Sequence, residues 1–280
     1  MSKPLALIIV VLLFVSCKRD IVPSRTAYFP KAAVQPEDIP EKENLWVFIL
    51  AGQSNMAGRG IVEPRDTIPS ERIFSINKAG ELIIAKEPLH FYEPKLTGLD
   101  LGMSFGREMI KQLPDSISIL LIPTAVGGSS MTQWLEDQEF RDVQLFSNFE
   151  EKAALGKQYG TIRGILWHQG ESDAATEETI GLYEQRLSQL VRKFRKVSGN
   201  DRLPVIFGEL GSFSKNREQW KQINEKIRSY AQSDSLTGVV KTGDLKDKGD
   251  KVHFDSKSLR TMGKRYAREY LKIYRQSHDR

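Results

Sequence analysis

Ser54 is the first side chain in the sequence whose surroundings suggest chemistry, and it lies in the stretch FILAGQSNMAG at positions 48–58. An apolar run stops there at glycine, glutamine, serine and asparagine, residues that favour turns. Two interpretations are open: an ordinary turn, or a serine nucleophile at the carboxyl end of a buried strand. Because a serine hydroxyl is a weak nucleophile until a base accepts its proton, the second interpretation requires a histidine.

His253 is the histidine, among four in the chain, whose neighbours suit a general base. It lies in GDKVHFD, with Asp250 three positions earlier. In a tight loop, a carboxylate at that spacing can accept a hydrogen bond from Nδ1–H and leave Nε2 free to face a serine. His90 has no acidic residue spaced to orient it, and His278 lies in a charged tail. A solvated surface loop is the other interpretation of the same spacing.

A metal site is the rival interpretation of this segment, because it is rich in carboxylates. The candidate ligands are Asp244, Asp247, Asp250, His253 and Asp255. Their spacing does not match an EF-hand calcium loop, which requires alternating acidic positions and a late glutamate. Zinc would usually require more histidine or cysteine. We therefore expect neither a metal nor any other cofactor.

Donors for an oxyanion are the next requirement of acyl transfer, and two glycine-rich stretches supply candidates. In AVGGSS, the backbone N–H of Gly127 or Gly128 is open to close approach because no side chain blocks it. In HQGESD, the Gln169 amide is an uncharged donor, and the Ser54 N–H would make a third. A tight turn and a water-binding loop glutamine are the ordinary interpretations.

Five continuous apolar runs predict buried strands, and amphipathic segments between them predict helices. The strands are expected at 45–51, 116–123, 162–170, 203–210 and 236–242. Alternation of this kind predicts a three-layer α/β/α domain with a central, mostly parallel, five-stranded sheet. Since sites in such sheets form at the carboxyl ends of the strands, the stretches around Ser54, Gly127, Gln169 and His253 should converge on one edge.

The motifs GQSNMAGRG, GGSS, HQGESD and DKVHFD follow one another in this order along the alternating pattern. Together they resemble the SGNH hydrolases, and within them the sialate O-acetylesterase-like, carbohydrate esterase family 6 type that includes acetylxylan esterases. The resemblance covers residues 45–272 or so, and we place the domain at 45–275. It implies a flavodoxin-like fold and a serine esterase that removes O-acetyl groups from acetylated polysaccharide or sialic acid.

The resemblance also implies a role for individual residues. Ser54 matches the nucleophile, and Asp250 and His253 match the D-x-x-H pair. A glycine of GGSS matches the second oxyanion donor, and Gln169 stands where many SGNH enzymes carry asparagine. His168, which precedes Gln169, is expected to support packing or the loop.

Substrate contacts are expected from the loops at 60–74 and 89–100. Arg59, Tyr92 and Trp134 either contact sugar or serve the structure, and Glu171 is expected to orient Arg59 or the Gln169 loop. The alternative function is a non-catalytic glycan-binding lipoprotein on the same fold. A binding module needs no activated serine, so the full set of nucleophile, base and donors favours the esterase.

The amino-terminal stretch predicts secretion. Lys3 precedes an apolar run at 5–15, which has the length of a signal-peptide core and ends just before Cys17, the single cysteine. This arrangement resembles a bacterial lipoprotein site and implies a signal peptide at 1–16 and lipidation of Cys17. An uncleaved membrane anchor is the alternative. Residues 17–44, with recurring prolines and charges, predict a linker. We expect an envelope protein held by its lipid at the outer membrane, the periplasmic face or the cell surface.

Composition sets only broad limits on the class of protein and its partners. The 280 residues are 40% hydrophobic and 28% charged, as in ordinary globular proteins. The net charge is +5, and both signs are interspersed. No basic stripe interleaved with aromatic residues points to nucleic acid, so we expect no nucleic-acid partner.

Overall fold

The computed structural model describes residues 24–278 of the chain. The predicted signal peptide and the lipidation site at Cys17 lie outside the described residues, so both stay predictions. Within residues 24–278, no helix combines the length and the apolar character that crossing a bilayer requires.

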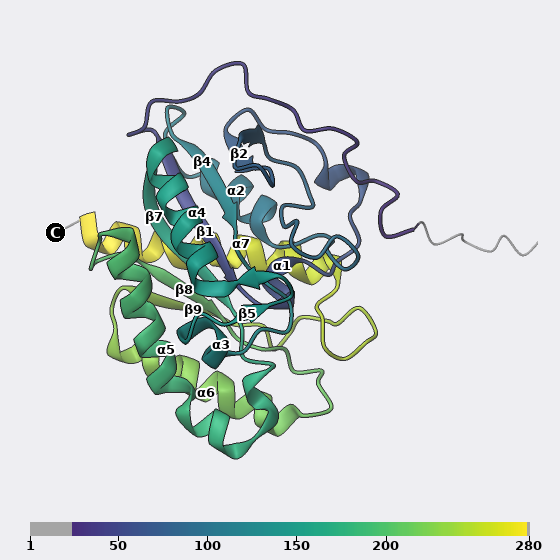
Figure 1. Ribbon diagram of the computed structural model, residues 1–280, viewed down its shortest axis with the longest axis vertical. Helices are drawn as coiled ribbons and strands as arrows, with labels where there is room; N and C mark the ends of the chain where they lie inside the picture. Colours follow the sequence, from purple (N-terminus) through teal and green to yellow (C-terminus); the bar gives the residue numbers. More distant parts are fainter. Residues whose placement is uncertain (1–23, 279–280) are drawn as a thin grey trace, which may run out of the picture.

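A seven-stranded sheet forms the middle layer, in the order β3-β2-β4-β1-β7-β8-β9 (Figure 1). Its strands are β1 (Leu45–Gly52), β2 (Ile73–Ile76), β3 (Leu82–Ile84), β4 (Ser118–Pro123), β7 (Thr161–His168), β8 (Val205–Gly208) and β9 (Thr237–Val240). All neighbouring pairs are parallel except β2 and β3. The mostly parallel sheet is confirmed, and the predicted number of five strands is wrong.

The two missed strands, β2 and β3, are short and form an antiparallel hairpin at one edge of the sheet. They contain four and three residues, which is too little for a clear hydrophobic pattern. β2 also contains a buried polar residue, Ser75, whose hydroxyl donates a hydrogen bond of 2.8 Å to the Leu121 carbonyl of β4. The predicted substrate loop at 60–74 overlaps the first two residues of β2, and the rest of the hairpin was not predicted.

Helices cover both faces of the sheet (Figure 1). α2 (Gly102–Ile110) and α7 (Ser256–His278) pack on one face, and α4 (Leu145–Tyr159), α5 (Glu177–Ser198) and α6 (Arg217–Ser233) pack on the other. The remaining elements are short: α1 (Ser54–Ala57), η1 (Pro64–Asp66), α3 (Met131–Leu135), β5 (Glu139–Phe140), β6 (Val143–Gln144) and η2 (Asp173–Ala175). The three-layer α/β/α architecture is therefore confirmed.

The uninterrupted apolar sequence of β1 is explained by its central position in the sheet. Alternate side chains of a strand point to opposite faces, so Trp46, Phe48 and Leu50 enter the core beneath α2 and α7. Val47 and Ile49 enter the core beneath α4 and α5. Every residue of β1 is buried, and the strand lies between β4 and β7. The chain leaves this central strand directly into the segment that carries Ser54.

Residues 24–44, expected to be a linker, lie along the domain in the part that the structure describes (Figure 1). The Ile84 N–H donates to the Val34 carbonyl over 2.8 Å, and the Arg25 guanidinium donates to the carbonyls of Pro94 and Thr97. This part of the segment is thus attached to the domain and does not stand away from it. A proline-rich composition does not reveal such contacts, because backbone carbonyls accept them.

Candidate active site

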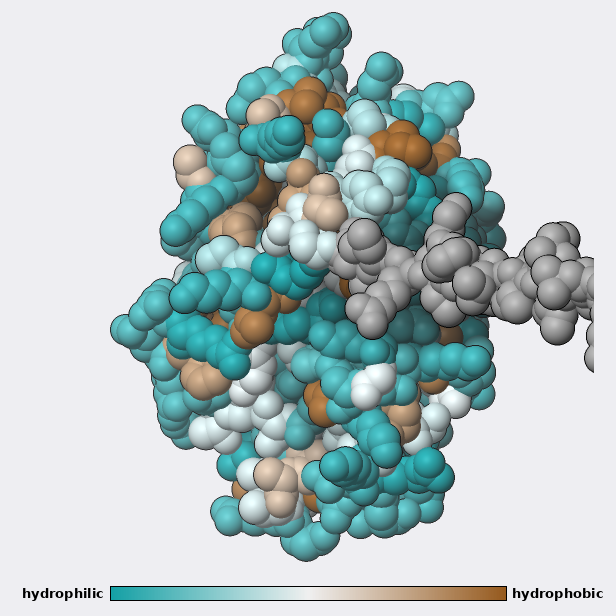
Figure 2. All heavy atoms as spheres, turned by 90° about the vertical axis from the view of Figure 1, so that its right-hand side faces the viewer, coloured by the Kyte–Doolittle hydropathy of each residue, from teal (hydrophilic) through white to brown (hydrophobic). Residues whose placement is uncertain are grey.

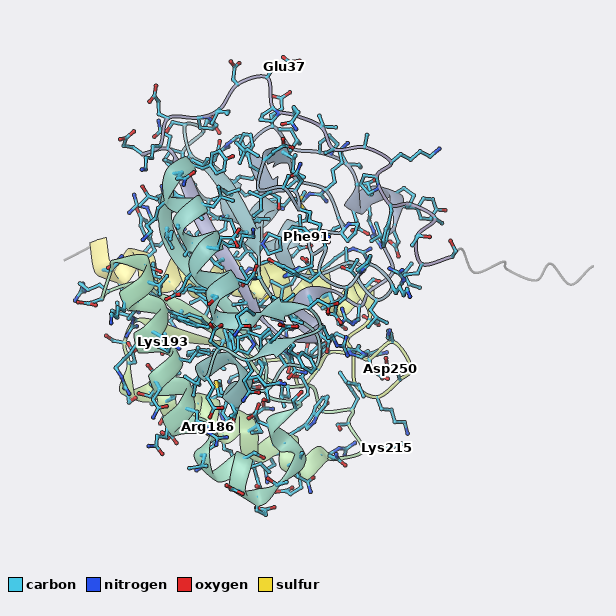
Figure 3. All side chains as sticks on the ribbon, viewed as in Figure 1. Glu37, Phe91, Arg186, Lys193, Lys215 and Asp250 are labelled. Carbon is cyan, nitrogen blue, oxygen red and sulfur yellow. The ribbon has the colours of Figure 1, made fainter. Side chains whose placement is uncertain are left out.

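The loops after β1, β4, β7 and β9 form one cleft at the carboxyl ends of the strands, with a volume of about 480 Å³. Its lining includes Ser54, Gly127, Gly128, Glu171, Asp250 and His253. Asp250 lies on a loop at the right-hand margin of the molecule in Figure 3. Figure 2 shows the face on that side, which is mainly hydrophilic with small, separate hydrophobic patches. Four segments distant in the sequence therefore meet at one hydrophilic edge.

The structure brings Ser54, His253 and Asp250 together in one chain of hydrogen bonds. His253 Nε2 lies 3.0 Å from Ser54 Oγ, and His253 Nδ1 lies 2.8 Å from Asp250 Oδ2. Asp250 Oδ1 also accepts hydrogen bonds from the backbone N–H groups of Val252 and His253, at 3.0 and 2.8 Å. This is the geometry required of a nucleophile, its base and the group that orients the base.

Gly52, the last residue of β1, makes the turn to Ser54 possible. Its φ is +132°, and a Cβ there would lie 2.1 Å from the His168 carbonyl oxygen of β7. The next N–H, that of Gln53, donates to the same carbonyl over 2.9 Å. A residue with a side chain would separate β1 from β7 at this point. Ser54 is consequently held against the sheet edge with only 5% of its surface exposed.

The charges in this chain of hydrogen bonds favour a neutral histidine and an ionised aspartate. Burial alone would raise the pKa of Asp250, but the hydrogen bonds from His253 and Val252 outweigh it and lower the pKa to about 2. Burial lowers the pKa of His253, and its hydrogen bond to Asp250 offsets only part of that effect. With Nδ1–H donated to Asp250, the unprotonated Nε2 can accept the Ser54 proton at neutral pH.

Gly127 and Gly128 differ in what their N–H groups do. The Gly127 N–H donates to Glu93 Oε2 over 2.7 Å, so it is already occupied. Within the described residues, the N–H groups of Gly128 and Ser54 donate to no protein acceptor, and both residues line the cleft. Gly128 has a φ of +85°, a conformation that glycine adopts without strain. These two N–H groups are the available oxyanion donors.

Gln169 does not lie where its sequence position suggested. Its side chain is fully buried and is not part of the cleft lining. Its amide nitrogen donates to the Ser129 carbonyl at 3.1 Å and to Asp173 Oδ2 at 2.5 Å. Both amide hydrogens are therefore occupied, and the prediction of Gln169 as an oxyanion donor is wrong. The residue instead supports the loop that presents Gly128.

Arg59, Glu93 and Arg141 form an ion-pair network beside Gly127. Arg59 pairs with Glu93 over 2.8 Å, and both side chains are buried. Arg141 pairs with the other oxygen of Glu93 and is 41% exposed. Burial would raise the pKa of Glu93, but Arg59 and the Gly127 N–H outweigh it and lower the pKa. Arg59 lines the cleft as expected, but its partner is Glu93 and not Glu171.

Trp134 and Tyr92 were expected either to contact sugar or to serve the structure, and they serve the structure. Trp134 is fully buried, its indole N–H donates to Ser129 Oγ over 2.9 Å, and its ring packs on Trp167. The Tyr92 hydroxyl donates to the Pro123 carbonyl at 3.1 Å. Neither residue lines the cleft. An aromatic side chain next to a glycine-rich loop can face either the solvent or the core, and the sequence does not distinguish the two.

His168 and His90 are structural. His168 is fully buried, and burial lowers its pKa to about 3, so it is neutral. His90 is buried as well, and its Nδ1 lies 2.8 Å from Asp100 Oδ2. The expectation that His90 has no acidic partner is therefore wrong. Asp100 lies ten positions later in the sequence, and the chain folds back to bring it into contact.

Asn55, Glu93 and Arg141 belong to the site and were not among the predicted residues. Arg141 lies at the turn of the β5–β6 hairpin with a φ of +53°, a conformation unusual for a residue other than glycine. The short hairpin places its guanidinium beside Gly128. Non-glycine residues in this conformation concentrate at functional sites, but the sequence gives no signal of it.

Within residues 24–278, no group of three or more His, Cys, Asp or Glu side chains is arranged to hold a metal ion. Asp244, one of the candidate ligands, pairs with Arg265 over 2.7 Å.

Comparison with known protein families assigns the chain to one of them. The family model described as carbohydrate esterase, sialic acid-specific acetylesterase matches residues 44–272. The chain belongs to this family. Membership supports an esterase that acts on carbohydrate, and the matched range includes all four loops of the cleft.

Relatives with solved structures agree with this assignment. The chain is 28% identical over 244 residues to a protein of Arabidopsis thaliana named as a probable carbohydrate esterase, covering 80% of this chain and 90% of that protein. An X-ray structure of the Arabidopsis protein gives a TM-score of 0.73 at 25% identity, covering 82% of this chain and 98% of the other. The crystal structure of NanS gives a TM-score of 0.68 at 18% identity, covering 85% of this chain and all of the other, and shows the fold alone.

Proposed function

We propose that this carbohydrate esterase is a serine O-acetylesterase that removes acetyl groups from a polysaccharide or from sialic acid. The observation that carries the proposal is the hydrogen-bond chain from Ser54 Oγ through His253 to Asp250, at 3.0 and 2.8 Å. Each of these side chains has a place in acyl transfer, and the protonation states favoured by their surroundings are the required ones.

In the first half of the reaction, Ser54 Oγ attacks the acetyl carbonyl carbon while His253 Nε2 accepts the hydroxyl proton. The imidazolium is stabilised by the ionised Asp250. His253 then gives the proton to the leaving sugar oxygen, and an acetyl-Ser54 ester remains. In the second half, His253 accepts a proton from water, the resulting hydroxide attacks the ester, and acetate leaves as Ser54 regains its proton.

The oxyanion formed in each half would accept hydrogen bonds from the N–H groups of Ser54 and Gly128. Both groups are without a protein acceptor in the described residues and line the same cleft. One such donor typically contributes about 10²–10³-fold in rate. Gly127 is excluded because its N–H is held by Glu93.

The charge of the cleft favours an acidic sugar over a neutral one. Five cationic residues line it: Arg25, Arg59, Lys95, Arg141 and Lys248. Glu93 neutralises part of the charge of Arg59 and Arg141, and Lys248 lies 3.5 Å from Asp250. A carboxylate on the sugar would be attracted to this surplus of positive charge. The description of the matched family, which names sialic acid, agrees with this preference.

The test is acetate release from an aryl acetate, an O-acetylated sialic acid and a neutral acetylated xylo-oligosaccharide. Ser54→Ala should lower the rate by about 10³-fold or more, and a chelator should leave it unchanged. Between the two sugars, kcat/KM should favour sialic acid, and added salt should reduce the difference. A Ser54→Ala protein with the parent rate would contradict the proposal. Binding of the glycan with no acetate release would favour the non-catalytic alternative.

A further inference from the structure

Asn55 makes three hydrogen bonds that connect the nucleophile segment with the loop of the base. Its Oδ1 accepts from the Phe254 N–H at 3.0 Å, and its Nδ2 donates to the Val252 carbonyl at 3.2 Å. Val252 and Phe254 are the residues on either side of His253. One buried side chain, next to Ser54 in sequence and 1% exposed, thus holds both neighbours of the base.

Glu171, in the loop after β7, supplies the third hydrogen bond. Its Oε1 accepts from Asn55 Nδ2 over 2.6 Å. The carboxylate side chain is 6% exposed, and its Oε2 has no partner in the described residues. His168 Nε2 lies 3.8 Å from Oε1, but burial keeps His168 neutral, so this contact is not a salt bridge. Asn55 is accordingly the group that engages this carboxyl.

These three contacts allow only one orientation of the Asn55 amide. If the amide were turned over, Oδ1 would face the Val252 carbonyl and Glu171, and the NH₂ group would face the Phe254 N–H. Each of these pairs would place acceptor against acceptor or donor against donor, at a cost comparable to a buried unsatisfied group. Glu171 therefore reinforces the orientation of Asn55 that the Val252 carbonyl and the Phe254 N–H require.

We propose that Glu171 is a positioning residue, which acts through Asn55 to hold the His253 loop against Ser54. The proposal rests on the proposed function and deepens it. Neither side chain is assigned a step in the chemistry. Their part is to keep the imidazole within hydrogen-bond reach of Ser54 Oγ, since a displacement of about 1 Å at such a site can cost about 10² in rate.

The environment of Glu171 agrees with an internal role. His168, Asp173, Tyr183 and Tyr266 face it from β7, η2, α5 and α7, and none of them carries a positive charge at neutral pH. Burial raises the pKa of Glu171 to about 7, and the hydrogen bond from Asn55 opposes that rise. Either protonation state of the carboxyl retains an oxygen that accepts from Asn55.

The experiment is a double-mutant cycle on the full chain, with kcat and KM measured for an aryl acetate. Glu171→Ala and Asn55→Ala should each lower kcat about 10²-fold, with KM within about twofold, since the substrate contacts remain. The double variant should be no slower than Asn55→Ala alone, because both changes remove the same connection. Glu171→Gln keeps an acceptor for Asn55 and should restore most of kcat.

Ser75→Ala is the matched control. It removes a buried hydrogen bond of 2.8 Å to the Leu121 carbonyl, remote from the cleft, and should leave kcat unchanged. If Glu171→Ala does not fold, Asn55→Asp takes its place, because a carboxylate there opposes both Glu171 and the Val252 carbonyl and should lower kcat as far as Asn55→Ala does.

Three results would overturn the inference: unchanged kcat in folded Glu171→Ala or Asn55→Asp, additive losses in the double variant, or a Glu171→Gln protein as slow as Glu171→Ala. The last result would mean that the carboxylate itself takes part in the reaction. These failures are distinct from a failure of the proposed function, which would appear as a Ser54→Ala protein that retains its activity.

Discussion

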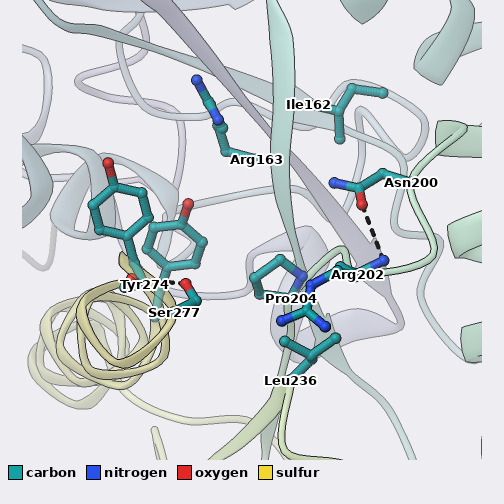
Figure 4. Close-up of a pocket in the computed structure, with 9 residues that line it drawn as sticks. Ile162, Arg163, Asn200, Arg202, Pro204, Leu236, Tyr274 and Ser277 are labelled. Atoms are coloured by element: carbon teal, nitrogen blue, oxygen red, sulfur yellow. Dashed lines mark hydrogen bonds between the residues drawn. The ribbon is translucent and has the colours of Figure 1, made fainter. Parts of the chain in front are cut away.

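Each end of the central sheet has a pocket, and the two pockets differ in the side chains that line them. At the amino ends of β7, β8 and β9, a pocket of about 290 Å³ is lined by Arg163, Arg202, Tyr274 and Ser277 among others (Figure 4). None of the described residues that line it is a histidine or a carboxylate. At the carboxyl ends, the cleft contains a hydroxyl, an imidazole and a carboxylate joined by hydrogen bonds.

The difference shows that hydroxyls and cations in a hollow are not sufficient for acyl transfer. The amino-end pocket has both, but none of the lining groups that the structure describes can accept a proton from a hydroxyl at neutral pH. Its Arg163 lies 4.9 Å from the centre of the Trp46 ring, a contact that stabilises the fold. At the carboxyl ends, glycine turns expose N–H groups and bring loops together, as expected for parallel α/β sheets.

The largest difference between the two ends should appear with Asp250→Asn. The amide cannot hold the tautomer in which Nδ1–H is donated and Nε2 is free, so kcat/KM should fall about 10³–10⁴-fold. Arg163→Ala, at the amino end, should cost about 1 kcal/mol of stability and leave kcat/KM within about twofold. Steady-state kinetics with an aryl acetate, together with thermal unfolding, would measure both. Equal losses of activity at the two ends would contradict the comparison.

A smaller effect should appear in the pH dependence of stability. The pKa of Glu171 is raised from 4.5 to about 7, so between these values the folded protein binds more protons than the unfolded chain. The contribution of Glu171 to the free energy of unfolding therefore falls as pH rises through that window, by about 3 kcal/mol in total. In the Glu171→Gln protein, the free energy of unfolding should not show this decline. Denaturant unfolding of both proteins at pH 5 and pH 8 would measure it. An equal change in the free energy of unfolding of the two proteins would contradict the prediction.

How much of the site the sequence predicts depends on how local each contact is. Asp250 and His253 are three positions apart, and Ser54 follows an unmistakable strand, so these side chains and their shared edge could be predicted. The donors could not. Whether an N–H is free depends on acceptors elsewhere in the fold. Glu93 lies 34 positions from Gly127, and the Ser129 carbonyl, which accepts from the Gln169 amide, lies 40 positions from it.

Other features could not be predicted from the sequence either. Asn55 stands inside a motif that was recognised, but its partners Glu171 and Phe254 are 116 and 199 positions away. The short edge strands β2 and β3 have too few residues for a periodic signal. For Trp134 the sequence left a sugar contact and a structural role open, and the structure buries its ring against Trp167.

The most direct test is to label the protein with a phosphonate ester that reacts with activated serines, and to locate the adduct by peptide mass spectrometry. The account predicts one adduct per chain, on Ser54, with loss of esterase activity in proportion to labelling and no adduct in His253→Ala. An adduct on another residue that abolishes activity, or full acetate release from a protein labelled completely at Ser54, would contradict it.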